Sequence, residues 1–262
     1  MSRRAALLAV EILAPVGLLT AWWFLSLDTT SPFFPPLRTM LRTFWETWTW
    51  DRIQQDVFPS VVNFSLGYVI AAVVGIAIGV FFGLNRIARR ATEPTVDFLR
   101  SIPAPAIISV FIIVLGFEDT MKITAIAFAS TFPILLNTID GVRGVDQQQL
   151  EMARAYKLRR QDEIFKIILP AASPQIFAGL RISLAVALAV MAFSEMFAGT
   201  DGLGFFIIFS QATYRVNEMY AGIFMLGILG YTVNLIFLAT ERRILRWHRG
   251  WRASELGAQG GG

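Results

Sequence analysis

Long apolar runs alternate with short polar segments along most of the chain. A helix that crosses a lipid bilayer needs about 20 mainly apolar residues, because every backbone polar group must be paired inside the hydrocarbon. Six runs meet this requirement, and they predict an all-α membrane protein with six transmembrane helices. The predicted spans are Ala5–Leu27, Val57–Gly83, Pro94–Leu115, Thr120–Thr138, Pro174–Phe197 and Met219–Thr240.

The segments between the spans differ in character. Leu37–Trp50 has the pattern of an amphipathic helix on the outer surface, with Trp45, Trp48 and Trp50 as anchors. Gly202–Thr213 is apolar but too short to cross, which favours a short outer helix or a re-entrant piece. Two further connections are a basic loop at Asn85–Glu93 and a tight outer turn at Gly116–Asp119.

The first span, Ala5–Leu27, follows two arginines, as the apolar core of a signal peptide does. Its length, and the aromatic run Trp22–Phe24 near its end, favour an uncleaved membrane helix. With the N-terminus inside, the predicted inner segments carry sixteen Lys and Arg residues and the outer segments carry five. This bias predicts that both termini lie in the cytoplasm. The outer five are Arg38, Arg42, Arg52, Lys122 and Arg215.

Composition narrows the function classes. Hydrophobic residues make up 55% of the 262 and charged residues 16%, below the roughly 25% charged residues of a soluble domain. The chain has no cysteine and a single histidine, His248, so thiolate metal sites and histidine dyads are excluded, and an intramembrane enzyme lacks a plausible site. The net charge of +4 reflects basic inner loops and not nucleic-acid binding.

The longest inner connection, Asp140–Ser173, lies between the fourth and fifth spans. Its pattern predicts two short helices, Gln147–Tyr156 and Gln161–Ile168, the second ending before Leu169–Pro170. Two exposed helices joined by a basic turn are typical of a docking surface, although a solvated loop that only connects two spans fits equally well. Glu151 has a similar alternative, since a carboxylate near a helix start also caps the helix.

The order E-x-A, about a dozen residues, then I-x-L-P resembles the signature loop of permease subunits of binding-protein-dependent ABC importers. Glu151, Ala153, Ile167, Leu169 and Pro170 match it. Further stretches resemble the nitrate/taurine/sulfonate branch of that family, and the likeness covers nearly all of the chain after about Pro32. These stretches are Leu99–Ala106, Phe132–Asp146, Ala178–Leu188, Ser194–Gly204 and Glu241–Trp247.

The resemblance implies a type I ABC importer permease fold, a single domain over residues 1–262 with a coupling loop at about 140–173 and a flexible tail at about 253–262. It implies a homodimer in the inner (plasma) membrane of a prokaryote. The implied partners are two cytoplasmic ATPase subunits, which hold ATP and Mg²⁺, and an extracytoplasmic binding protein. No cofactor is expected in this chain, and nucleic acid is not an expected partner. A channel or ion-coupled carrier acting alone is the alternative, and it would need no docking loop.

In the family, the signature loop seats in a groove of the ATPase. The resemblance implies that Glu151 pairs with a basic group there and that Ala153 is small so that the helix seats closely. The implied coupling residues are Glu151, Met152, Ala153, Ala155, Lys157, Leu169 and Pro170. The solute is not readable from the sequence, because the branch covers sulfonates, taurine, nitrate and heterocyclic vitamin precursors.

Lys157 departs from the family pattern, which has glycine six residues after the glutamate. Glycine there permits a left-handed turn between the two short helices. Lys157 must therefore either adopt a strained left-handed backbone or change the type of turn.

Polar residues within the spans are candidates for lining a pathway, because they are costly to expose to lipid. Arg181 and Glu195 share one face of the fifth span, about 21 Å apart; alternatively Arg181 reaches the inner interface and Glu195 caps an outer turn. Pro103 and Pro105 predict a break in the third span near its inner side. The candidate lining residues are Arg100, Pro103, Ser130, Thr131, Asn137, Arg181 and Glu195. Small residues spaced for close helix packing are Gly67, Gly75, Gly79 and Gly83.

Overall fold

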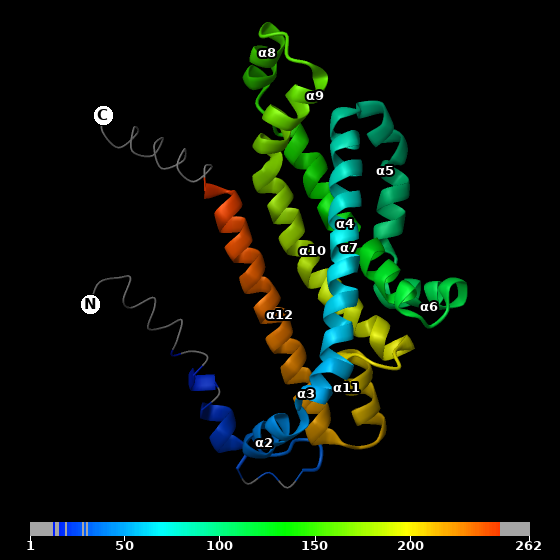
Figure 1. The fold of residues 1–262 in the computed structure, drawn as a ribbon, viewed down its shortest axis with the longest axis vertical. Helices are drawn as coiled ribbons and strands as arrows, with labels where there is room; N and C mark the ends of the chain where they lie inside the picture. Colours follow the sequence, from blue (N-terminus) through cyan, green and yellow to red (C-terminus); the bar gives the residue numbers. More distant parts are fainter. Residues whose placement is uncertain (1–12, 14–15, 19, 28, 30, 247–262) are drawn as a thin grey trace, which may run out of the picture.

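The computed structural model of the protein describes residues 13, 16–18, 20–27, 29 and 31–246. Every regular element in these residues is a helix (Figure 1). Four of the helices are long and apolar enough to cross a bilayer, and a bent pair makes a fifth crossing if it is counted as one. The first predicted span, Ala5–Leu27, lies partly outside the described residues, as the predicted tail at 253–262 does entirely. The six-span total and the cytoplasmic termini therefore stay predictions.

The four long helices confirm four predicted spans, and each extends a few residues beyond them. Two of these helices continue shorter helical segments at their start and form continuous helices of 35 and 39 residues, and the other two stand alone. Their segments are α3 (Trp50–Arg52), η1 (Ile53–Val57) and α4 (Phe58–Leu84); α7 (Asp119–Arg143); α9 (Arg160–Glu163), η2 (Ile164–Ile168) and α10 (Leu169–Ala198); and α12 (Val216–Ile244).

The predicted helix end before Pro170 is wrong, because α9, η2 and α10 form one continuous helix. Proline breaks a regular helix by removing a hydrogen bond and crowding the preceding turn. Here the preceding turn is a π-helix, in which the N–H of Leu169 donates to the carbonyl of Ile164 five residues earlier. This wider turn leaves room for the proline ring, so the helix continues.

Two helices form the third predicted span, Pro94–Leu115, with the expected break between them. α5 (Arg86–Ser101) and α6 (Ala104–Leu115) meet at an angle of 93°. The segment Asn85–Glu93, predicted as a loop, forms the start of α5 instead. Asn85 explains this start, since its side-chain oxygen accepts hydrogen bonds from the N–H groups of Ile87 and Ala88, both at 3.1 Å.

The bend itself was predicted at Pro103, and Ile102 before it has the extended backbone that a following proline favours. Pro105 lies in the first turn of α6, where it does not break the helix. The predicted depth is wrong, however. The bend lies beside Phe128 and Pro133 in the middle of α7, and not near an end of the bundle.

The shorter elements follow their sequence patterns. α2 (Leu37–Thr47), α8 (Gln147–Ala155) and α11 (Leu203–Ala212) confirm three predicted short helices. A turn at Gly116, with φ of 80°, joins α6 to α7 as expected. Trp45 and Trp50 are exposed, as membrane anchors should be. Trp48 is not an anchor of this kind, because it is buried against Phe206 and its Nε1 donates to the carbonyl of Ala221 at 3.1 Å.

Figure 1 shows the long helices side by side, with α8 and α9 at one end of the bundle and α11 at the other. These ends are called the loop end and the α11 end below. Buried apolar side chains of α4, α6, α7 and α10 form the main core. A second cluster around Ile168 and Val142 closes the loop end. A third, around Trp48 and Leu203, joins α2, α11 and α12 at the α11 end.

α4 and α7 run in parallel at very short distance, and glycines of α4 make this possible. Each glycine faces one β-carbon of α7, so that an added methyl group would lie 2.6–2.9 Å from it. The facing pairs are Gly67 with Ile126, Gly75 with Ile134, Gly79 with Thr138, and Gly83 with Val142. The predicted close packing of this glycine face is confirmed.

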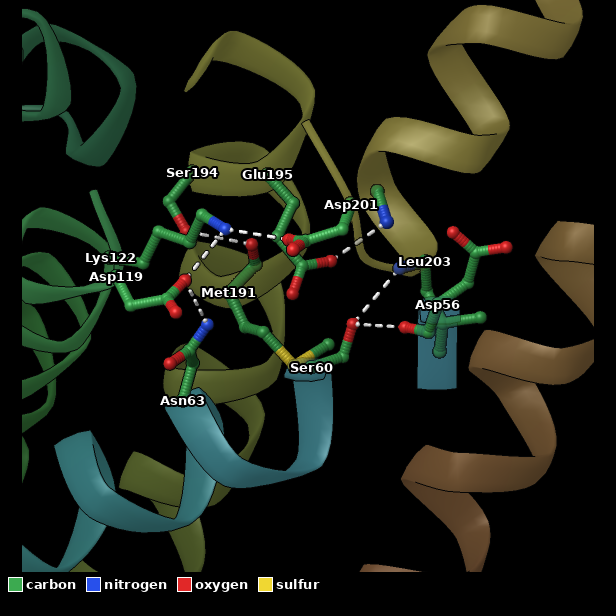
Figure 2. A network of polar contacts seen from close by, with 11 residues as sticks. Asp56, Ser60, Asn63, Asp119, Lys122, Met191, Ser194, Glu195, Asp201 and Leu203 are labelled. Atoms are coloured by element: carbon green, nitrogen blue, oxygen red, sulfur yellow. Dashed lines mark hydrogen bonds and ion pairs between the residues drawn. The ribbon is translucent and has the colours of Figure 1, made fainter. Parts of the chain in front are cut away.

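A cluster of charged and polar side chains joins four elements at the α11 end (Figure 2). Its centre is Lys122 of α7, whose side chain is 4% exposed. Lys122 Nζ lies 2.9 Å from Asp119 Oδ1 and 3.0 Å from Asp201 Oδ1, and Asn63 Nδ2 of α4 also donates to Asp119. A buried ammonium needs such partners, because burying it alone is very costly.

Two further contacts of this cluster fix the start of α11. The N–H of Leu203 donates to Ser60 Oγ at 2.9 Å, and the N–H of Gly204 donates to Glu195 Oε2 at 2.8 Å. The first N–H groups of a helix have no partner within it, so an oxygen at this place acts as a cap. The α11 end is therefore held by polar contacts from α4, α7 and α10.

We expect Gly79→Ala to destabilise the protein by about 1–3 kcal/mol, because its methyl group would collide with Thr138 Cβ and the carbonyl of Leu135. Chemical unfolding in detergent measures the effect. Gly227→Ala in α12 is the matched control, since nothing lies within 4 Å of its added carbon. An equal loss in both variants would contradict the packing argument.

We expect Lys122→Met to lower the free energy of unfolding by about 2 kcal/mol. The loss is smaller than for a fully buried pair, because Asp119 and Asp201 are about half exposed and regain water. The same unfolding measurement applied to Arg42→Met, in the exposed Arg42–Glu46 pair, should show no measurable change. If Lys122→Met were as stable as wild type, the cluster would not hold the α11 end.

Candidate functional site

The loop between α7 and α10 is the candidate site, and it projects beyond the other helices at the loop end (Figure 1). Asp146 begins α8: its carboxylate accepts a hydrogen bond from the N–H of Gln148 at 3.0 Å, as a helix cap does. α8 therefore begins at Gln147, where the sequence pattern predicted its start.

Glu151 lies in the middle of α8 and is exposed. The first turn of α8 contains no acidic residue, so Glu151 does not cap the helix, and the capping alternative does not hold. Its only described contact is with Gln147, whose Nε2 lies 3.3 Å from Glu151 Oε1. The carboxylate therefore remains accessible to a partner.

Ala153 is buried within the loop, and its expected contact with an ATPase stays a prediction. Its exposed fraction is 2%, because it faces the rest of its own loop. Its small side chain lets α8 approach η2 closely and lines part of a groove beneath α8. Met152 and Ala155, on either side of it, are exposed.

The turn after α8 has the left-handed backbone, which is one of the two outcomes left open for Lys157. The φ of Lys157 is 53°. The N–H of Leu158 donates to the carbonyl of Ala153 five residues earlier at 3.1 Å, which is the closing bond of a Schellman motif. Glycine usually occupies this position, and another residue costs about 1–2 kcal/mol there.

Large apolar side chains surround this turn and remain exposed. Tyr156 is 80% exposed and Phe165 68% exposed, and Met152 and Leu158 join them. A groove of about 760 Å³ lies beneath α8, and Pro170 lines it together with Met152 and Tyr156. Exposed apolar residues grouped around a groove are typical of a protein interaction surface. Leu169 and Pro170 are half-buried in the first turn of α10.

Charges at the margin of this surface are partly paired. Arg160 Nη1 lies 2.8 Å from Glu163 Oε2, and Lys166 Nζ lies 2.7 Å from Asp162 Oδ1. Lys157 is exposed beside them. Among the described residues, no group of three or more His, Cys, Asp or Glu side chains is placed to hold a metal ion.

The candidate pathway residues are not gathered in one place. Arg100 lines a cavity of about 310 Å³ at the bend between α5 and α6, beside the exposed Pro103. Ser130 is fully buried between helices. Thr131 donates to the carbonyl of Ala127 in its own helix, and Asn137 accepts a hydrogen bond from Gln175 at 3.0 Å.

Glu195 lies near the end of α10 and Arg181 lies near its middle, and the two side chains have different surroundings. Glu195 is fully buried and caps α11 through the N–H of Gly204, which is the alternative considered for it. Arg181 is exposed.

Sequence reasoning missed the ionic cluster at the α11 end. Lys122 was counted as a basic residue of an outer loop, although it is buried within α7. The position of Lys122, close after Asp119 at the start of an apolar run, was the feature of the sequence that could have indicated its burial. Asp201 could not be recognised as its partner, because 79 positions separate the two.

Comparisons with known proteins agree with this architecture. Residues 55–248 match the family described as "Binding-protein-dependent transport system inner membrane component". A protein described as an aliphatic sulfonates transport permease, SsuC of Bacillus subtilis strain 168, is 31% identical over 192 residues, which are 73% of this chain and 70% of SsuC. The taurine transport system permease protein TauC of Escherichia coli K12 is 29% identical over 88% of this chain and 86% of its own.

A solved structure shows the same fold. The inward-facing MetNI methionine ABC transporter contains a chain with a TM-score of 0.58 and 19% identity, covering 82% of this chain and 99% of that one. The family match includes all four long helices, the bent pair and the α8–α9 loop. The chain therefore belongs to the family of binding-protein-dependent transport system inner membrane components, as a permease of the nitrate/taurine/sulfonate branch of ABC importers.

Proposed function

We propose that the protein is one of two identical permease subunits of an ATP-driven importer in a prokaryotic plasma membrane. Residues 1–262 form a single domain that crosses the bilayer six times, with both termini and the loop end in the cytoplasm. The excess of Lys and Arg in the inner segments supports this orientation. This excess becomes larger when Lys122 is removed from the outer count, because Lys122 lies within a helix and not in an outer loop.

The surface around α8 carries the proposal. It combines an accessible carboxylate on Glu151 with the exposed side chains of Met152 and Tyr156 above a groove. We propose that this surface binds a cytoplasmic ATPase subunit, which supplies ATP and Mg²⁺. A permease acting alone would gain nothing from exposing these side chains to the cytoplasm.

The continuous helix from Arg160 to Ala198 offers a route for coupling. One end carries the ATPase-binding loop, and the other end holds the start of α11 through Glu195. A displacement of α8 by the closing ATPases would move this rod as a unit. In this proposal, ATP binding favours the outward-facing arrangement of the two permeases, and hydrolysis returns them to the inward-facing one.

The proposed cargo is a small solute delivered by an extracytoplasmic binding protein. Sulfonates, taurine and nitrate are supported by the names of the relatives SsuC, TauC and NrtB, and CmpB adds bicarbonate. A heterocyclic vitamin precursor is the neutral member of the proposed set. ATP-dependent uptake into proteoliposomes that contain the permease, its ATPase and its binding protein tests the function. No uptake of any of these solutes, with the complex assembled, would contradict it.

We expect Glu151→Ala to weaken ATPase binding about 10- to 150-fold, because a hydrogen bond to a charged group contributes about 1.5–3 kcal/mol. The variant should still insert and form dimers, since Glu151 makes no contact with the bundle among the described residues. Titration of the purified permease with the ATPase measures the affinity. Gln148→Ala, also exposed on α8, is the control. Unchanged affinity and transport in Glu151→Ala would remove Glu151 from the coupling surface.

Lys157 gives a second test at the same surface. We expect Lys157→Gly to stabilise the isolated permease by about 1 kcal/mol, because glycine relieves the left-handed backbone. Its ATPase affinity should stay near wild type, while Lys157→Glu should bind more weakly than Lys157→Gly. Unfolding measurements and the ATPase titration separate the two effects. Identical affinities for the Gly and Glu variants would show that the charge plays no part.

A further inference from the structure

The polar residues of α5 all lie on one face. At 100° per residue they fall within an arc of about 120°, while apolar residues and two threonines fill the rest of the circumference. All but one of them are exposed. They are Arg86, Arg89, Arg90, Glu93, Asp97, Arg100 and Ser101.

This polar face extends far along the bundle. α5 turns back from the loop end beside α4 and extends for about 24 Å, most of the roughly 30 Å of hydrocarbon in a bilayer (Figure 1). Its last turn contacts the middle of α7, where Arg100 lines the same cavity as Phe132 and Pro133. Arg100 is thus about 15 Å or more along α7 from either end, too far for its side chain to reach an interface.

Charges at this depth cannot face lipid, so the polar face of α5 must face water or protein. In the single chain it is open, and the Arg100 side chain is 49% exposed. Four arginines against one glutamate and one aspartate give the whole face an excess of positive charge, which is concentrated at Arg86, Arg89 and Arg90 near its start, while Arg100 is the positive charge near its far end. A positively charged wall with apolar surroundings concentrates anions.

Arg100 is held in an orientation that suits an oxyanion. Its Nε donates to Asp97 Oδ1 at 2.9 Å, one turn back on the same helix. Within the described part of the chain, no acceptor lies within hydrogen-bond distance of its two terminal nitrogens. A guanidinium anchored in this way presents two parallel donors, which match two oxygens of a carboxylate, sulfonate or similar group.

We propose that the polar face of α5 forms the wall of the inner half of the translocation pathway, and that Arg100 binds the oxyanion group of the solute. The cavity of about 310 Å³, with Ile107, Phe128 and Phe132 in its wall, receives the small remainder of the solute. The inference rests on the proposed import function and sharpens it: the cargo is a small oxyanion, and a neutral heterocycle is excluded.

Accessibility of introduced thiols tests the wall. The chain has no cysteine, so single variants need no background removal. In inside-out membrane vesicles that carry the full chain, Glu93→Cys and Ser101→Cys should react with membrane-impermeant methanethiosulfonates. Phe98→Cys, on the apolar face and 69% exposed in the single chain, should react at least tenfold more slowly. Equal rates on the two faces would overturn the proposal.

Reagent charge tests the role of Arg100. A unit charge about 6 Å away in water changes the rate ratio of an anionic to a cationic reagent about tenfold. Adding Arg100→Gln to Ser101→Cys should therefore lower this ratio about tenfold, while adding Arg42→Gln, at an exposed site on α2, should leave it unchanged. An unchanged ratio with Arg100→Gln would overturn the assignment.

Two small probes test oxyanion binding directly. Methanesulfonate should slow the reaction of the Ser101→Cys variant, whereas neutral dimethyl sulfone of similar shape should not, and Arg100→Gln should abolish the difference. Equal effects of both probes would overturn the proposed anion site. These readouts need only the inserted permease, so their failure is distinguishable from a failure of ATP-driven uptake.

Discussion

The close contact between α4 and α7 is the constraint on which the bundle depends. Four glycines of α4 bring its backbone against β-carbons of α7, and the two helices run in the same direction. Two parallel neighbours need a returning connection between them, and the bent pair α5–α6 provides it. On its other side α7 approaches α10 equally closely, since a β-carbon added at Gly179 would lie 2.6 Å from Asn137 Cβ. α7 is therefore enclosed on two sides, and the remaining helices pack around this three-helix layer.

Hydrophobicity predicted four spans that the structure confirms, and glycine spacing predicted the close-packed face of α4 but not its partner α7. These sequence patterns gave wrong predictions where a single residue or turn had more influence than the average hydrophobicity of its segment. Asn85 starts a helix in a segment that looks like a loop, and the π-turn before Pro170 continues a helix where proline usually ends one. Trp48 and Lys122 were assigned to the surface by residue type, yet both are buried because partners distant in sequence satisfy their polar atoms.

The candidate site was predicted almost entirely from its resemblance to a family, and the structure shows which of its residues are accessible. Ala153 contributes through packing within its own loop, while the accessible groups are Glu151 and the apolar side chains near Tyr156. The unusual lysine after α8 keeps the left-handed turn that glycine would provide. The side-chain positions that decide these roles depend on the fold of η2 beneath α8, which one sequence does not reveal.

The π-turn η2 has a consequence for how this region can vary. A π-turn holds one residue more than the α-helical turn it replaces, and here it joins the loop to the 30-residue α10 without a flexible break. Losing a residue within Ile164–Ile168 would rotate α9 relative to α10 by about 100° and turn the proposed docking surface away from its present direction. Most loops accept small insertions and deletions, but here the number of residues in η2 determines the rotation of α9 relative to α10. Length changes during the divergence of such permeases should therefore collect elsewhere, in segments such as the connection before α2.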